Sequence, residues 1–136
     1  MLALKLPPVL AWMAVAALAG GCASTGSIKN EPLDAGVSRA FEGSYDHVLR
    51  AAREATTAAG LAIDSYEAVD STTSVIVAKK GASAFSWGEL VRVVVQKTDA
   101  GHVMVRVYTA RRLATNITAK GDYSDTIFQN IELSLK

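Results

Sequence analysis

Two valine-rich runs separated by a short turn constrain the fold of this chain more than any other feature. Residues 89–98 and 102–111 largely alternate apolar with polar side chains, and Asp99, Ala100 and Gly101 separate the two runs. Alternation with a period of two is typical of a half-buried strand. The pair therefore predicts an antiparallel hairpin whose three-residue loop holds Gly101 in a left-handed conformation.

The register of this hairpin follows from the need to keep the valines on one face. When Thr98 faces His102, valine pairs with valine, whereas a shift by one residue pairs valines with charged or polar residues. The same register places Arg92 opposite Tyr108 on the other face of the sheet. The predicted pairs are Val95 with Val105, Val93 with Val107, and Arg92 with Tyr108.

The rest of the apolar pattern predicts a further strand, a further hairpin and two helices. Ser44 is a good N-cap for the first helix, and Gly60 is suited to end that helix in a left-handed cap. Asp122 is suited to cap the last helix. The predicted elements are a strand at 37–41, a helix at 44–59, a hairpin of 61–66 and 73–79, the valine-rich hairpin, and a helix at 122–135.

These elements define a single α+β domain over residues 37–136. Their order, β-α-β-β-β-β-α, favours an antiparallel sheet of four to five strands with two helices packed on one face. A chain of about 115 residues can bury a sufficient core without cross-links. Cys22 is the single cysteine, which excludes an intramolecular disulfide framework.

Residues 1–21 have the layout of a signal peptide. Lys5 precedes an uncharged run, residues 6–21, with Pro7 and Pro8 near its start. This run is shorter than the about 20 apolar residues that a helix needs to cross the hydrocarbon core. A permanent transmembrane helix is therefore not expected.

Small residues immediately before Cys22 make the end of this segment more specific. The sequence resembles the lipobox of bacterial lipoproteins, although Ala19 stands where the usual leucine would, and Leu18 lies one place earlier. The resemblance implies cleavage between Gly21 and Cys22, lipidation of the Cys22 sulfur, and acylation of the new N-terminus. The alternative is an ordinary secretory signal, cut for instance after Ala19 or Ala23.

The segment after the cleavage point predicts a flexible tether. Residues 22–36 are small, polar and proline-containing, with no periodicity that could bury a face. A lipid at Cys22 would hold the protein in the bacterial cell envelope, because two or more acyl chains anchor a protein stably. The position directly after Cys22 is Ala23 rather than an acidic residue, which by resemblance to lipoprotein sorting implies the outer membrane, facing the periplasm.

The charge of the processed chain does not favour nucleic acid as a partner. Removing Lys5 with residues 1–21 leaves 13 basic and 13 acidic residues. A neutral chain has no field of one sign that would concentrate nucleic acid or anionic lipid. Contact with the membrane would therefore depend on the lipid anchor.

A second resemblance covers residues 37–135. It rests on residues 41–49, on a helix that ends just before residues 61–63, on two valine-rich hairpins, and on a final helix. This combination looks like the small bacterial lipoproteins of unknown function. It is also similar, more distantly, to the helix-grip domains of BamC, a lipoprotein of the outer-membrane barrel-assembly machinery. The resemblance implies the fold and the envelope location, and its hydrophobic positions imply no chemistry.

The sequence holds no recognisable catalytic or metal-binding motif. Group transfer would need a nucleophile, a base and an orienting group, and neither His47 nor His102 lies in a triad motif. Asp64, Glu67 and Asp70 approach a carboxylate cluster, but on a strand Glu67 points away from the other two. We therefore expect that this protein is not an enzyme and that it has no cofactor and no metal site.

Two groups of residues are candidates for binding a partner. Phe85 and Trp87 lie among small residues in the loop between the hairpins, and they either cap the core, bind a partner, or touch the lipid surface. Arg92, Arg106 and Tyr108 share the sheet face opposite the valines. That face is either an ordinary solvated surface or a docking face for an acidic protein, headgroup or glycan.

The primary hypothesis is a membrane-anchored periplasmic lipoprotein that acts as a protein-interaction or structural module of the cell envelope. Its candidate partner is another envelope protein. The competing hypothesis is a carrier or sensor that binds a lipid or small apolar ligand between the helices and the sheet. A carrier of this kind needs an empty cleft at that place.

Overall fold

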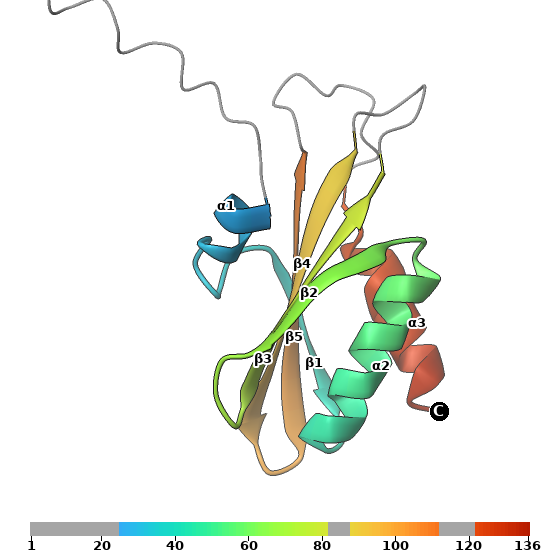
Figure 1. Cartoon of the computed structure of the whole chain (residues 1–136). Coiled ribbons are helices and arrows are strands. Elements are labelled where there is room, and N and C mark those ends of the chain that lie inside the picture. Colours follow the sequence, from blue (N-terminus) through green and yellow to red (C-terminus); the bar gives the residue numbers. More distant parts are fainter. Residues whose placement is uncertain (1–24, 82–87, 112–121) are drawn as a thin grey trace, which may run out of the picture.

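The computed structural model of the chain describes residues 25–81, 88–111 and 122–136, and it confirms the α+β class. Five antiparallel strands form one sheet in the order β1-β5-β4-β3-β2. The strands are β1 (Val37–Glu42), β2 (Ala62–Ala68), β3 (Thr73–Lys80), β4 (Glu89–Asp99) and β5 (His102–Arg111). The longest strands, β4 and β5, lie in the interior of the sheet, and the short strands β1 and β2 form its edges (Figure 1).

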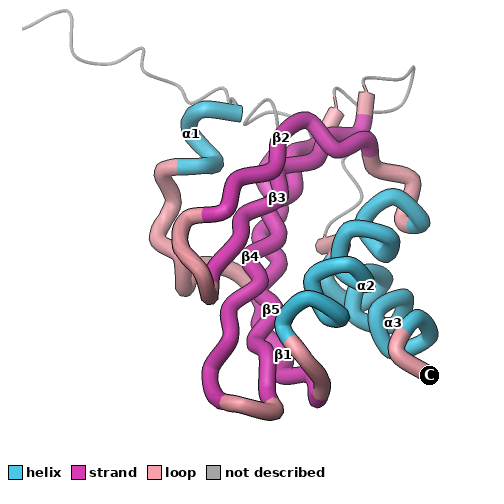
Figure 2. Tube along the Cα trace, turned by 60° about the horizontal axis from the view of Figure 1, so that its bottom comes forward, coloured by secondary structure: helices cyan, strands magenta, loops and turns pink. Residues whose placement is uncertain are grey.

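Two helices pack side by side on one face of the sheet, as the sequence predicts. They are α2 (Tyr45–Ala58) and α3 (Ser124–Ser134). A third helix, α1 (Thr25–Lys29), lies on the opposite face, and the sequence pattern did not predict it (Figure 2). We call the face that carries α2 and α3 the inner face and the face that carries α1 the outer face.

The register of the valine-rich hairpin is confirmed along most of its length. Val95 pairs with Val105, Val93 with Val107, and Arg92 with Tyr108. The turn differs from the prediction, because Asp99 rather than Thr98 pairs with His102 and the register shifts between Lys97 and Asp99. Positive φ occurs at Gly36, Gly43, Gly60 and Gly88 among the described glycines, so Gly101 is not left-handed. The bulge takes up the extra residue that the prediction assigned to the loop.

The predicted ends of α2 are confirmed by its caps. The Ser44 hydroxyl accepts a hydrogen bond from the His47 backbone N–H at 3.3 Å. Gly60 follows the C-cap with a φ of +85°, which favours glycine. In α3 the Asp122 carboxylate accepts from the Ser124 backbone N–H at 2.9 Å, although Tyr123 occupies the N-cap position itself.

The main core lies between the inner face and the two long helices. Its strand side chains include the paired valines of β4 and β5, and α2 contributes mainly alanines, which let the helix approach the sheet closely. Phe128 of α3 is buried there, and its ring lies 6.0 Å from that of Phe41 on β1. The four-residue spacing of apolar residues in the last helix predicted that Ile127 and Ile131 are buried, and both are fully buried. The spacing did not predict the burial of Phe128.

A smaller core lies on the outer face beneath α1. Ile28 of α1 packs on four buried side chains of β3 and β4, which are Val75, Val77, Leu90 and Val94. This corrects the prediction of a flexible tether for residues 25–36, which we call the strap. The physical reason is that β3 and β4 present apolar side chains on both faces, and the strap removes the outer set from water.

Candidate functional site

The centre of the outer face holds a fully buried arginine. Arg92 lies on β4, and its side chain points away from the valines of the main core toward the strap. A buried arginine is rare in proteins unless its charge and its N–H groups find partners. The contacts of Arg92 therefore define the strongest candidate site in the described residues.

Three backbone carbonyls of the strap accept hydrogen bonds from the Arg92 guanidinium. Nη1 donates to the carbonyl oxygens of Ile28, at 3.1 Å, and of Glu31. Nη2 donates to the carbonyl oxygen of Pro32 at 2.6 Å. Two of these carbonyls, those of Glu31 and Pro32, belong to the turn that follows α1, and the Pro32 carbonyl also accepts from the Ala35 backbone N–H at 2.9 Å. The planar guanidinium thus binds the strap through its backbone.

The remaining surroundings of Arg92 are aromatic and weakly acidic. Its guanidinium carbon lies 5.7 Å from the centre of the Tyr108 ring, which is within the range of a cation–π contact. Burial lowers the pKa of Arg92, and the nearby charges of Glu31 and Tyr108 oppose this shift. An arginine stays protonated in proteins, so the site holds a permanent cation that binds carbonyl oxygens.

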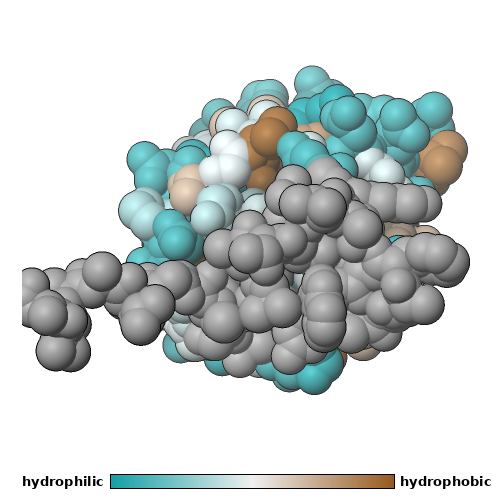
Figure 3. Space-filling view, turned by 90° about the horizontal axis from the view of Figure 1, so that it is seen from above, coloured by the Kyte–Doolittle hydropathy of each residue, from teal (hydrophilic) through white to brown (hydrophobic). Residues whose placement is uncertain are grey.

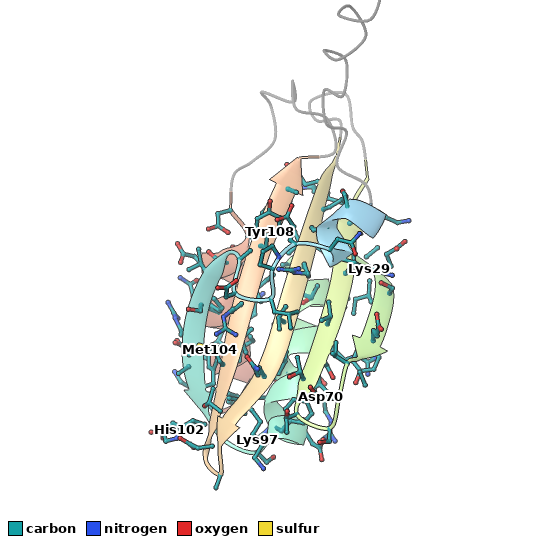
Figure 4. The ribbon with its side chains drawn as sticks, turned by 90° about the vertical axis from the view of Figure 1, so that its left-hand side faces the viewer. Lys29, Asp70, Lys97, His102, Met104 and Tyr108 are labelled. Atoms are coloured by element: carbon teal, nitrogen blue, oxygen red, sulfur yellow. The ribbon has the colours of Figure 1, made fainter. Side chains whose placement is uncertain are left out.

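The predicted strip of Arg92, Arg106 and Tyr108 is therefore divided by the strap. Arg92 is not on a solvated surface, which corrects that interpretation. The strap accepts hydrogen bonds from both terminal nitrogens of its guanidinium, whereas the buried Nε has no partner among the described residues. Tyr108 is half-buried beside the second core. Arg106 is partly exposed and donates to the Gln96 side-chain oxygen at 3.0 Å. Figure 4 shows this face, with Tyr108 near α1 and Met104 further along β5.

The other candidate residues of the sequence lie outside the described residues. Cys22 precedes Thr25, and Phe85 and Trp87 belong to residues 82–87. The described ends of β3, β4 and β5 next to residues 82–87 and 112–121 lie at the same end of the sheet as α1 (Figure 1). We call this the near end, and the end that carries the turns after β2 and β4 the far end.

Both histidines lie toward the far end of the molecule. His47 is exposed in the first turn of α2. His102 Nδ1 lies 2.7 Å from Asp99 Oδ1, and this hydrogen bond raises the pKa of His102. Asp99 also accepts from the Gly101 backbone N–H at 3.0 Å, which is the main reason that its pKa is lowered. The pair thus closes an exposed turn.

The three carboxylates of the predicted cluster are separated by their contacts. Asp64 forms an ion pair with Lys79 at 3.0 Å. Asp70 lies beyond the end of β2 and accepts from the Thr72 backbone N–H and hydroxyl, at 2.7 and 2.9 Å. In the part of the chain that the structure describes, no three His, Cys, Asp or Glu side chains are grouped as metal ligands.

Two polar contacts that the sequence did not predict connect the helices to the sheet. Ser74 of β3 is buried, and its hydroxyl is hydrogen-bonded to the hydroxyl of Tyr45 and, at 3.3 Å, to that of Tyr66. Burial raises the pKa of Tyr45. At the near end, burial and the Glu89 carboxylate raise the pKa of Tyr123. A lone serine in a valine-rich strand was the only signal for the first contact.

A shallow groove lies between α2 and α3. Its volume is about 360 Å³, and it is lined by Glu54, Ala55, Ala58, Asn130, Leu133 and Ser134. The Asn130 amide donates to the Ala55 carbonyl at 3.4 Å, and the Ser134 hydroxyl donates to Glu54 at 3.2 Å. The groove is on the helical surface, so it is not the cleft between helices and sheet that a carrier would need.

None of the helices in residues 25–81, 88–111 and 122–136 is long and apolar enough to cross a membrane. The chain matches no known protein family, no curated protein and no solved structure in comparisons of sequence and fold. The fold class is thus an α+β domain with a five-stranded antiparallel sheet, two helices on the inner face and a strap on the outer face.

Proposed function

We propose that this protein is a lipid-anchored periplasmic lipoprotein of the bacterial cell envelope, in the outer membrane, that acts as a protein-interaction or structural module. The observation that carries the proposal is the run of small residues that ends at Cys22, behind an uncharged segment with one preceding lysine. The first described helix, α1, begins at Thr25, three residues beyond the proposed anchor.

A binding role fits the described residues better than catalysis. The buried cation Arg92 is used to hold the strap, and the His102–Asp99 pair is exposed in a turn. Neither arrangement places a base beside a nucleophile, which group transfer would need. The candidate partner is an envelope protein, and no cofactor or metal is part of the proposal.

The anchor is tested by replacing Cys22 with serine. We expect Cys22→Ser to move the full-length protein from the detergent-requiring membrane fraction to the soluble periplasmic fraction, without loss of folded structure by circular dichroism. The matched control is Ser24→Ala, which leaves the acceptor sulfur in place and should stay membrane-bound. Detergent-requiring association of the Cys22→Ser protein would contradict the lipid anchor.

The interaction role is tested by site-specific photocrosslinking in cells. A photoreactive residue replaces Trp87, and the same residue at position 53 on α2 serves as the control. A discrete protein adduct from position 87 alone is expected for an interaction module. Lipid adducts alone would identify a membrane contact instead, and no adduct would contradict a partner at this loop.

The carrier hypothesis has less support in the described residues. The space between the sheet and the two long helices is filled by buried side chains, among them Val48, Ile76 and Phe128. A bound lipid or apolar ligand would have to displace them, which is unfavourable in a densely packed core. Native mass spectrometry of the purified protein, with no ligand mass beyond the covalent anchor, is the expected result.

A further inference from the structure

The strap changes how the domain would sit relative to its anchor. A free segment of 15 residues, such as the predicted tether 22–36, would have a root-mean-square reach of about 20 Å and would let the domain rotate. In the structure, residues 25–36 are bound to the sheet through Ile28 and Arg92 instead. Only residues 23 and 24 then separate Cys22 from Thr25, where α1 begins.

The length of this connection limits the distance from the anchor. Three residues, even fully extended, span at most about 11 Å. The connected helix, α1, lies at the near end, because Ile28 packs against Leu90 at the beginning of β4 and Val77 toward the end of β3. The far end is much more distant, since the 11 residues of β4 extend over about 36 Å.

The far end is poorly suited to approach a lipid surface. Asp70 and Asp99 are exposed in its two turns, and backbone hydrogen bonds lower the pKa values of both carboxyls, so they stay ionised. Moving ionised carboxylates into a headgroup layer costs solvation free energy. Viewed toward the near end, the described surface that remains visible beside the grey atoms is mainly hydrophilic (Figure 3).

We infer that the strap is a rigid spacer that holds the near end of the sheet against the lipid surface carrying the Cys22 anchor, with the far end directed away. This inference rests on the proposed lipid anchor. Its consequence is a fixed orientation, in which the far-end turns face the periplasm.

The orientation is tested with one fluorophore at either end of the sheet. Gly81 and Gly101 are exposed, have no positive φ, and have no atom within 4 Å of an added Cβ, so Gly81→Cys and Gly101→Cys are a matched pair. Both proteins are purified at full length, labelled with a maleimide donor, and placed in phosphatidylcholine vesicles that contain an acceptor-labelled lipid headgroup. Lipidation blocks the Cys22 sulfur, so only the new cysteine reacts.

We expect energy transfer from position 81 to exceed that from position 101 at least about threefold, because the two positions lie at opposite ends of strands about 35 Å long. Equal transfer in vesicle-bound protein would overturn the orientation and leave the anchor standing. Labelling of the unsubstituted chain at Cys22, or failure to float with vesicles, would instead overturn the proposed anchor, so the two failures are distinguishable.

Two further variants test whether the strap causes the orientation. Insertion of 12 Gly and Ser residues between residues 24 and 25 adds a reach of about 20 Å without touching the docked strap, and should bring the two transfer values close together. Arg92→Met should do the same by releasing the strap, whereas the control Arg106→Met should keep the difference. An unchanged difference after the insertion would overturn the role of the strap as spacer.

Discussion

At the scale of single residues, Arg92 is the side chain that decides where the strap lies. It satisfies three carbonyls with one cation, and these carbonyls in turn make burial of the cation tolerable. Removal of the strap would leave the buried cation without these acceptors, which is unfavourable. Arg106, two register positions away on the neighbouring strand, pairs with Gln96 and is partly exposed.

Arg92→Met should therefore release the strap. The loss of hydrogen bonds from a charged donor costs roughly 1.5–3 kcal/mol each, and removal of the buried charge offsets much of this cost. We expect the free energy of unfolding to fall by about 2 kcal/mol in total. Amide hydrogen exchange in residues 25–36 should accelerate more than exchange in β4. Arg106→Met, the control, should change stability by less than about 1 kcal/mol. Equal effects of the two substitutions would contradict the assigned role.

His102 gives a pH-dependent prediction at the same scale. Its pKa is raised in the folded state by the hydrogen bond to Asp99, above the ordinary value of 6.5. While Asp99 is ionised, the pair therefore stabilises the turn fully below about pH 6.5, and this contribution is lost as the pH rises through the higher folded-state pKa of His102. An NMR titration of the His102 ring should show a midpoint above 6.5.

Asp99→Asn should move this midpoint down, because it removes the carboxylate that favours the imidazolium. The matched control is Asp70→Asn, which removes a carboxylate from the other far-end turn and should leave the His102 midpoint in place. A midpoint that does not respond to Asp99→Asn would show that the pair does not form in solution.

At the scale of elements, the connection between the strap and β1 depends on one glycine. Gly36 has a φ of +98°, and an added Cβ would lie 2.3 Å from the Val107 carbonyl oxygen. Gly36→Ala would thus combine an unfavourable conformation with a clash against backbone, and neither can be relieved by a rotamer change. The strap, β1, or both must shift.

We expect Gly36→Ala to lower the free energy of unfolding by about 2 kcal/mol or more. Gly81→Ala is the matched control, because its added Cβ meets no atom within 4 Å and its φ is not positive, and it should be nearly neutral or slightly stabilising. Chemical denaturation of both proteins provides the comparison. A Gly36→Ala protein as stable as the Gly81→Ala protein would contradict the close approach to β5.

The long elements could be predicted from the sequence because their periodicity is a local signal. Valines at every second position of β4 and β5 place one face inward in a single register, and the four-residue spacing of Ile127 and Ile131 does the same for α3. α1 could not be predicted in this way. It has one buried apolar residue, Ile28, which cannot define a period.

The burial of Arg92 could not be predicted either, because it depends on which segment covers the outer face. A charged side chain in an alternating strand is usually expected to face solvent. Here the strap, about 60 positions earlier in the chain, covers Arg92 and buries it. The continuous apolar run of β3 was the available signal. Strands buried on both faces lack alternation, and a second covering layer is then needed.

At the scale of the whole molecule, the fold has three layers, with helices α2 and α3, the sheet, and the strap in that order (Figure 2). The second core is small. The strap covers it, so the near-end part of the outer face is not an exposed apolar surface. An uncovered patch of this kind on a sheet promotes self-association. The strap therefore favours solubility by covering this patch.

Two truncations separate the strap from the segment that precedes it. A variant that begins at residue 25 retains Ile28 and all three carbonyls that bind Arg92, and it should remain monomeric and as stable as the processed chain without its lipid. A variant that begins at residue 37 exposes Val77, Leu90 and Val94 and leaves the Arg92 charge without those acceptors. It should be less stable by several kcal/mol, bind a hydrophobic dye, and self-associate in light scattering. Equal stability and mass of the two truncated proteins would show that the strap is not part of the folded unit.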